Sequence, residues 1–254
     1  MHGSFETSAA GSGEESGQES GETFYATGPL EGRRVRLEPL TVAHIPGLVA
    51  AAREGRERYA LTDVPADEAE AAAYVARALR TSPGGVPETV PYATVDRHTG
   101  RVVGSTRFCD FEYWRWQERY RRRPAAEPDA VEIGATWLAL GAQRTGINRE
   151  AKLLMLTVAF ERWRVHRVRF RTDARNERSR RAIAALGARL DGVLRAAAAG
   201  YDGAVRDSAA YSILDAEWAE VRAGLEASLS GGPRIGGREI GRPRTGGPAT
   251  GCPA

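Results

Sequence analysis

Seven short stretches of the chain have the pattern of β-strands with a buried face. Each either alternates apolar and polar residues or consists of a continuous apolar run bounded by turn residues. The clearest reads Arg-Val-Arg-Phe-Arg from Arg167 to Arg171. Two others flank the segment Arg97-His98-Thr99-Gly100, which is typical of a hairpin turn. The predicted strands span residues 33–37, 92–96, 101–108, 131–140, 167–171, 190–194 and 207–214.

Five segments predict helices. The strongest runs from Glu150 to Trp163, where most of the apolar residues follow the 3.6-residue period of a helix with one buried side. Thr41 before the first helix and Gly187 after the fourth are residues that commonly begin and end helices. The predicted helices span residues 42–55, 67–79, 150–163, 179–186 and 218–225.

The predicted order is therefore β-α-α-β-β-β-α-β-α-β-β-α, which is an α/β (α+β) pattern of one sheet with helices packed against it. Residues 1–29 are rich in Gly, Ser and Glu, and residues 230–254 are rich in Gly, Pro and Arg. We expect both ends to be disordered. The remaining residues, 30–229, suit a single domain.

Composition narrows the class of protein. The net charge of +3 does not by itself indicate a nucleic-acid partner. Cys109 and Cys252 lie too far apart in sequence for a CxxC metal site, and the four histidines show no metal-ligand spacing. Apolar runs are shorter than a membrane span, and the N-terminal residues do not read as a secretory signal. We expect a cytoplasmic protein without a metal.

The segment Gln143-Arg144-Thr145-Gly146-Ile147-Asn148 lies between a predicted strand and the strongest predicted helix. A glycine-containing turn that leads into a helix aims unpaired N–H groups and the positive end of the helix dipole outward. Such a turn can bind a phosphate or pyrophosphate. Because no Lys-Ser/Thr pair follows the glycine, the segment does not match a P-loop.

A second segment, Asp173 to Ala188, contains Asn176-x-x-Ser179 followed by a short predicted helix and Leu186-Gly187-Ala188. Together with the turn, it resembles the GNAT superfamily of acyl-CoA-dependent N-acetyltransferases. The run Glu132 to Leu138 and the residues Asn148-x-Glu150-Ala151-Lys152 are similar to the branch that contains ribosomal-protein N-terminal acetyltransferases. The resemblance spans about 30–215. Asn148 departs from it, because the superfamily turn usually has Gly or Ala there.

The resemblance implies a mixed, mostly antiparallel sheet of about seven strands, splayed between its fourth and fifth strands, with acetyl-CoA as co-substrate. Backbone N–H groups around Trp137 and Leu138 would polarise the acetyl carbonyl. Asn176 would bond the pantetheine arm, and Ser179 would solvate the leaving thiolate. Asn176 to Ser179 also suits a plain helix cap, which is compatible with both roles. The residues expected at the pyrophosphate are Gln143, Arg144, Thr145, Gly146, Ile147 and Asn148.

Forming an amide from a thioester requires a neutral amine, and a carboxylate acting through water can serve as the base. Glu132, at the start of a strand that leads to the turn, is the first candidate, and Asp110 is the second. An exposed carboxylate at a strand start remains the alternative for Glu132. Neither cysteine has a recognisable catalytic partner, so direct attack of the amine is the simpler mechanism.

The connection from Phe108 to Asp129 is long, and after Phe108 it interleaves five aromatic residues with five arginines. Such a segment can pack on the body of the protein or form a homodimer contact, bind the acceptor, or stack on nucleic-acid bases. We favour the first of these and consider nucleic acid the least favoured.

The resemblance thus implies transfer of an acetyl group to a primary amine, and the resemblance to the ribosomal-protein branch implies a protein N-terminus as the acceptor. The alternatives are a small-molecule amine of the aminoglycoside or polyamine type, and a non-catalytic module that binds acyl-CoA or RNA.

Overall fold

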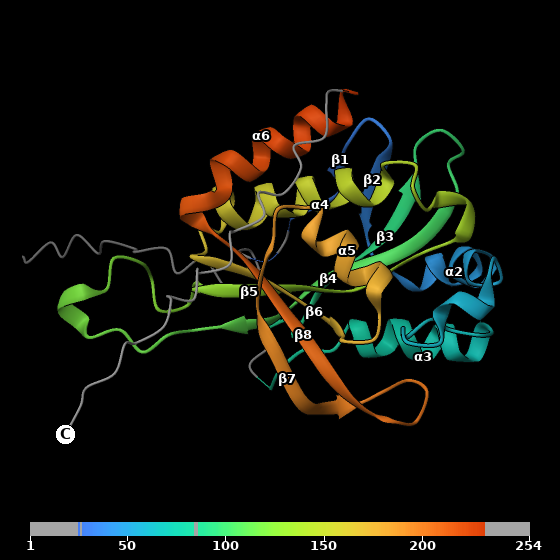
Figure 1. The fold of residues 1–254 in the computed structure, drawn as a ribbon, viewed down its shortest axis with the longest axis horizontal. Coiled ribbons are helices and arrows are strands. Elements are labelled where there is room, and N and C mark those ends of the chain that lie inside the picture. The colour runs from blue at the N-terminus through green and yellow to red at the C-terminus, as the bar shows by residue number, and fades with distance from the viewer. Residues whose placement is uncertain (1–24, 26, 84–85, 232–254) are drawn as a thin grey trace, which may run out of the picture.

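The computed structural model describes residues 25, 27–83 and 86–231 (Figure 1). The sheet has eight strands in the order β1-β2-β3-β4-β5-β6-β8-β7, and only β5 and β6 run parallel. This confirms the mixed, mostly antiparallel fold class, with a short additional strand at one edge. The strands are β1 (Leu30–Glu31), β2 (Val35–Pro39), β3 (Val90–Asp96), β4 (Val102–Glu112), β5 (Ala130–Leu138), β6 (Arg167–Asp173), β7 (Arg189–Ala199) and β8 (Val205–Leu214).

Helices cover both faces of the sheet. On one face α2 packs on β4 and on α3, and on the other α4 packs on α6 and β2. The helices are α2 (Ile45–Ala52), α3 (Glu68–Ala78), α4 (Ile147–Thr157), α5 (Glu177–Ala184) and α6 (Trp218–Leu229). The predicted tails, 1–29 and 230–254, lie almost entirely outside the described residues, although Tyr25 is placed and its side chain is buried.

Each face of the sheet contributes to its own hydrophobic core. The larger core, on the α4 side, includes Phe108, Met155 and Trp163. The smaller core, on the α2 and α3 side, includes Tyr74 and Trp137. Strand β5 contributes Val131, Ile133 and Leu138 to the larger core and Trp137 to the smaller one, so both of its faces pack against a core.

Several predicted elements differ in extent from those observed; strand β7, predicted at 190–194, spans Arg189–Ala199. Helix α4 begins three residues earlier than expected, at Ile147, because Gly146 takes a left-handed φ of 93° and acts as its N-cap. The first predicted helix starts as a 3₁₀ turn, Val42–His44, before α2. Strand β4 continues to Glu112, which leaves residues 113–129, called the arm below, as the connection to β5 (Figure 1).

Buried Glu150 ties α4 to the start of the sheet. Its carboxylate accepts three backbone N–H groups, from Arg33 at 2.9 Å, Arg34 at 2.7 Å and Val35 at 3.0 Å. Gly32 leaves room for this contact, because a Cβ at that residue would lie 2.6 Å from the Glu150 carboxyl carbon. Hydrogen bonds to a charged acceptor are stronger than neutral ones, so this contact fixes the first turn of α4 against β2.

Lys152 ties the same helix to the centre of the sheet. Its amine is buried and donates to Thr106 Oγ1 of β4 at 2.7 Å and to Thr136 Oγ1 of β5 at 2.6 Å. Burial lowers the pKa of this amine from 10.5 to about 7. Lys152 is also the only lysine of the sequence. Unlike arginine, which keeps its charge, lysine can occupy such a position as the neutral base.

We predict that Glu150→Ala destabilises the fold by about 3 kcal/mol, because three backbone donors lose a charged acceptor. Urea unfolding of the full chain measures the change. The matched control is Glu226→Ala at an exposed position of α6, where the lost carboxylate pairs with Arg222 alone among the described residues. This control changes stability by less than about 0.5 kcal/mol. Equal effects in the two variants would contradict the role of Glu150.

We predict that Lys152 titrates near pH 7 in the folded chain. With ¹³C-labelled lysine, NMR gives a single Cε resonance, whose shift follows the amine directly. Between about pH 7 and 10.5 the unfolded chain binds one more proton at this residue, so its contribution to folding stability rises with pH through that window. The unfolding free energy of the wild type relative to Lys152→Met therefore rises by up to about 1.4 kcal/mol per pH unit. A midpoint near 10.5 for the NMR signal would contradict the assignment.

Candidate active site

Strands β5 and β6 separate after a short parallel contact. Their paired residues run only from Ala130↔Arg167 to Glu132↔Arg169, whereas β5 continues to Leu138. The opposite edge of β5 stays paired with β4 as far as Leu138. One edge of the last six residues of β5 therefore has no partner strand among the described residues. This is the splay that the resemblance implied.

A bulge in β5 lies within this unpartnered stretch. Arg107 of β4 faces Gly134 and Ser105 faces Trp137, so two residues of β5 lie opposite Thr106 alone. Ala135, one of the two, has a left-handed φ of 46°. A non-glycine residue in this conformation inside a strand is strained, and such strain is typical of functional sites. The Thr136 hydroxyl beside it is the one that Lys152 holds.

Two side chains hold the end of β5, and one of them was a predicted cofactor ligand. The amide nitrogen of Gln143 and the hydroxyl of Tyr59 both donate to the carbonyl oxygen of Leu138, each at 2.9 Å. Gln143 thus fixes the strand end from the turn that follows it. Trp137 packs its ring edge-on against Tyr59, and its indole N–H is buried without an acceptor among the described residues.

The turn after β5 presents free donors. Arg144 and Gly146 take left-handed φ values of 64° and 93°, and the first regular helical bond runs from Glu150 N–H to the Gly146 carbonyl. In the described part of the chain, the N–H groups of Asn148 and Arg149 find no acceptor. They form an N-terminus suited to an anion, and anion binding at this turn stays a prediction. Arg34, which sequence reasoning missed, lies beside the turn, since a Cβ on Gly146 would be 3.3 Å from its Cδ.

Asn176 is the N-cap of α5, as the alternative interpretation of this segment predicted. Its Oδ1 accepts the backbone N–H of Ser179 at 3.1 Å. The Ser179 hydroxyl is not part of this cap, and the residue is half-buried. Its role toward a leaving thiolate therefore remains a prediction. Asn176 and Ser179 follow β6, whereas Glu132 lies on β5 where the two strands part.

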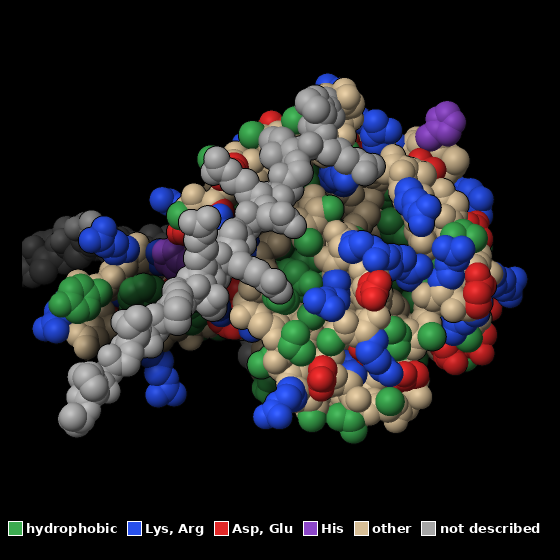
Figure 2. Space-filling model, in the orientation of Figure 1, with side chains coloured by type: hydrophobic (Ala, Val, Ile, Leu, Met, Phe, Trp, Pro, Cys, Tyr) green, Lys and Arg blue, Asp and Glu red, His purple; other side chains and the backbone are tan. Residues whose placement is uncertain are grey.

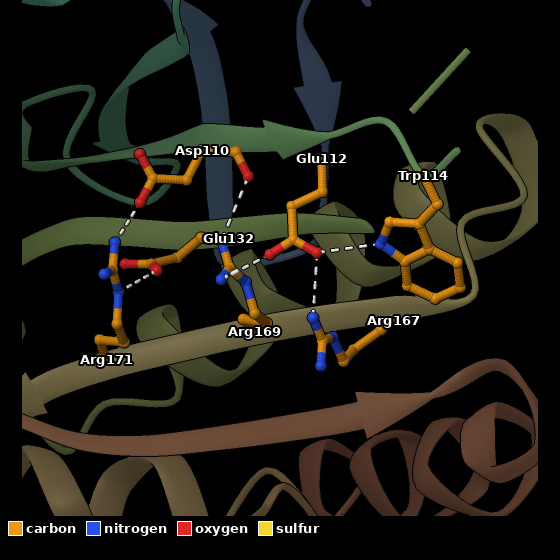
Figure 3. Close-up of polar contacts among 7 residues, drawn as sticks. All are labelled: Asp110, Glu112, Trp114, Glu132, Arg167, Arg169 and Arg171. Atoms are coloured by element: carbon orange, nitrogen blue, oxygen red, sulfur yellow. Dashed lines mark hydrogen bonds and ion pairs between the residues drawn. The ribbon is translucent and has the colours of Figure 1, made fainter. Parts of the chain in front are cut away.

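Glu132 belongs to a ladder of charged side chains that crosses β4, β5 and β6 (Figure 3). Arg171 of β6 pairs with both Glu132 and Asp110, the two candidate bases. Further along, Arg169 and Arg167 pair with Glu112 at 2.6 and 3.0 Å. Burial raises the pKa of the Glu132 carboxyl above its usual range, and Arg171 opposes this rise. A buried carboxylate with a raised pKa is a stronger base than an exposed one.

Cys109 lies opposite Glu132 in the sheet, and burial, with smaller contributions from Glu132 and Asp110, raises the pKa of its thiol to about 12. The thiol is therefore protonated near neutral pH, which makes it a poor nucleophile. This supports the expectation of direct attack by the amine. The described residues contain no group of three or more His, Cys, Asp or Glu side chains that could hold a metal ion.

Sequence reasoning missed the side chains that α3 and the loop before it bring to the splay. Tyr74 of α3 donates to the carbonyl of Ala135 at 3.5 Å, and Arg107 lies 5.0 Å over the Tyr74 ring. Tyr59 comes from a 3₁₀ turn, Arg56–Tyr59. No motif marks these residues, because their proximity to β5 depends on how the helices dock.

Every helix in the described ranges is too short or too polar to cross a membrane.

Comparison with known proteins agrees with this geometry. Residues 34–189 match the family model "Acetyltransferase (GNAT) domain". No curated protein matches the chain. A putative acetyltransferase from T. thermophilus is 35% identical, with 80% of this chain and 97% of that chain covered and a TM-score of 0.62.

Two further solved structures are similar. A GCN5-related N-acetyltransferase from Brucella melitensis is 27% identical, with 79% and 85% of the two chains covered and a TM-score of 0.66. A putative ribosomal-protein-serine acetyltransferase from Vibrio cholerae is 18% identical, with 74% and 98% covered and a TM-score of 0.59, a likeness of fold alone. Because residues 34–189 match the GNAT domain and strands β5 and β6 separate as described above, we conclude that the chain belongs to the GNAT family. It is an acyl-CoA-dependent N-acetyltransferase.

Proposed function

We propose that this chain transfers an acetyl group from acetyl-CoA to the N-terminal amine of a protein in the cytoplasm. The observation that carries the proposal is the unpartnered edge of β5, which leads directly into the donor-rich turn at the start of α4. An extended pantetheine arm can bind such an edge as an added strand does. Its pyrophosphate then lies at the helix N-terminus.

The residues present fit acetyl-CoA at this place. The N–H groups of Asn148 and Arg149 and the side chain of Arg34 supply donors for phosphate oxygens. The amide of Gln143 instead holds the Leu138 carbonyl, so its contribution is to the shape of the turn. Backbone N–H groups near Trp137 and Leu138 would orient the acetyl carbonyl, and the buried indole N–H of Trp137 offers one further donor.

Glu132 is the proposed base. Its carboxylate takes the proton of the incoming ammonium group through water, which leaves a neutral amine able to attack the acetyl carbonyl. The Ser179 hydroxyl donates a hydrogen bond to the departing thiolate. A pocket of about 270 Å³ next to Tyr59, lined also by Asp63 and Tyr201, provides space for the first residues of an acceptor. The ribosomal-protein acetyltransferases among the similar structures support a protein acceptor.

We predict that Glu132→Gln lowers kcat by about 10²–10⁴-fold, since the amide is no base, while affinity for CoA is unchanged. Steady-state kinetics and calorimetry measure the two quantities. In the wild type, kcat/KM falls as pH drops through the raised pKa of Glu132, and this limb is absent in the variant. Glu112→Gln is the matched control, because it removes a carboxylate from the same ladder at the end away from the splay. Full activity of Glu132→Gln would assign the base to another group.

We predict that Ser179→Ala lowers kcat by about 10- to 100-fold, as expected for the loss of one hydrogen bond to a charged group, without loss of stability. The stability is kept because Asn176 caps the helix through the backbone N–H of residue 179, which alanine retains. Thermal unfolding and kinetics separate the two effects. A fall in melting temperature with unchanged kcat would show that Ser179 is structural.

The acceptor class is tested with purified protein, acetyl-CoA and four amines. The first is a peptide with a free N-terminus, and the second is a version of it with a blocked N-terminus and an internal lysine. The other two are spermidine and kanamycin. We expect release of the CoA thiol only with the free N-terminal peptide. Turnover of spermidine or kanamycin instead would replace the protein acceptor by a small-molecule amine, and turnover of none would favour a binding module.

A further inference from the structure

The arm, residues 113–129, is fixed at its root. The carboxylate of Asp129 accepts the backbone N–H of Trp114 at 2.7 Å and the indole N–H of Trp116 at 2.8 Å. The Trp114 ring stacks on His166, with centroids 5.7 Å apart and planes 19° apart. Arg123 donates to the carbonyl of Arg164 at 2.6 Å. These contacts fix the base of the arm to the body of the protein. The remaining side chains of the arm therefore project from a fixed backbone.

The outer part of the arm is both basic and aromatic. Residues 113–123 contain five arginines and one glutamate, whereas the whole chain has 36 basic and 33 acidic residues. Arg115, Arg119 and Arg122 form no ion pair with any described residue. Tyr120 is 59% exposed, and the Arg119 guanidinium lies 4.9 Å over its ring. Figure 2 shows basic and hydrophobic side chains beside one another on this projection, away from the body.

A pocket of about 450 Å³ lies where the arm meets the body, with Trp116, Tyr120 and Arg122 on the arm side and Arg164 on the body side. Its two acidic side chains are already engaged, since Asp129 holds the tryptophans and Asp215 pairs with His166 at 3.1 Å. Arg164, like Arg122, has no ionic partner among the described residues. The pocket therefore combines aromatic walls with uncompensated positive charge.

We propose that the arm binds single-stranded nucleic acid, with a base stacked at Tyr120 and Trp116 and neighbouring phosphates paired with Arg122 and Arg164. Exposed rings beside free guanidinium groups are the combination that single strands require, because their bases offer open faces and their backbone is anionic. In a duplex the base faces are already stacked and cannot reach the aromatic side chains. An acidic peptide supplies negative charge but need not supply rings to stack on them. This surface is separate from the splay, so its occupation does not depend on acetyl transfer.

Fluorescence anisotropy of labelled 12-residue oligouridine and oligothymidine, with the full chain and no coenzyme, tests the proposal. Tyr120→Leu keeps an apolar side chain but removes the ring, and weakens binding about tenfold. Arg122→Ala combined with Arg164→Ala reduces the slope of log K against log salt by about 1.4, the value for two phosphate contacts of a single strand. Arg80→Ala combined with Arg181→Ala, two exposed arginines that pair with Glu88 and Glu177 outside the arm, removes the same two charges and leaves both quantities unchanged.

Circular dichroism first establishes that each variant is folded. Tighter binding of oligouridine than of oligothymidine assigns RNA as the ligand, and the reverse assigns DNA. The proposal is overturned if a duplex or heparin binds as tightly as the single strands, or if Tyr120→Leu binds like the wild type. It is also overturned if sedimentation shows a dimer that Tyr120→Leu dissociates, because the arm is then a contact between two copies of the chain.

Discussion

The separation of β5 from β6 is the constraint on which the rest of this structure depends. A parallel pair that stops after Glu132 leaves backbone groups of a buried strand without a partner strand, which is costly in a protein interior unless something else bonds them. Tyr59, Tyr74 and Gln143 satisfy two carbonyls of this strand, at Ala135 and Leu138. We propose that an extended ligand completes the sheet at the remaining edge.

Two buried ionisable groups on α4 keep this opening in a fixed shape. Glu150 fastens the first turn of the helix to the backbone before β2, and Lys152 fastens the next residues to Thr106 and Thr136. Both lie within one turn of the donors at Asn148 and Arg149. The helix N-terminus that we propose as the anion site and the bulge that lies beside the splay are therefore held by the same element. Fixed geometry of this kind is what transition-state stabilisation requires.

Much of this arrangement was predictable from local sequence. The order of strands and helices follows from periodicity and turn residues, and the turn at Gly146 follows from its place before a strong helix. The cap at Asn176 follows from the preference of asparagine for that position. In each case the signal lies within a few consecutive residues, where backbone preferences act directly.

What the sequence missed depends on contacts between distant segments. Arg171 lies 39 residues from its partner Glu132, and Tyr59 lies 79 residues from the Leu138 carbonyl that it bonds. The roles of Glu150 and Lys152 were also missed, although both stand in a quoted motif, because an acidic or basic residue in a helix is usually solvent-exposed. The early start of α4 depends on the left-handed conformation at Gly146, which one glycine in a turn permits but does not require.

Hydrogen exchange of the full chain, with and without acetyl-CoA, tests most directly whether the parted strands and the α4 turn are the coenzyme site. The account predicts slower exchange on binding at residues 133–138 and 147–149, where backbone donors gain partners, and unchanged exchange in the arm. Slower exchange confined to the arm, or binding without any change in those two segments, would contradict it.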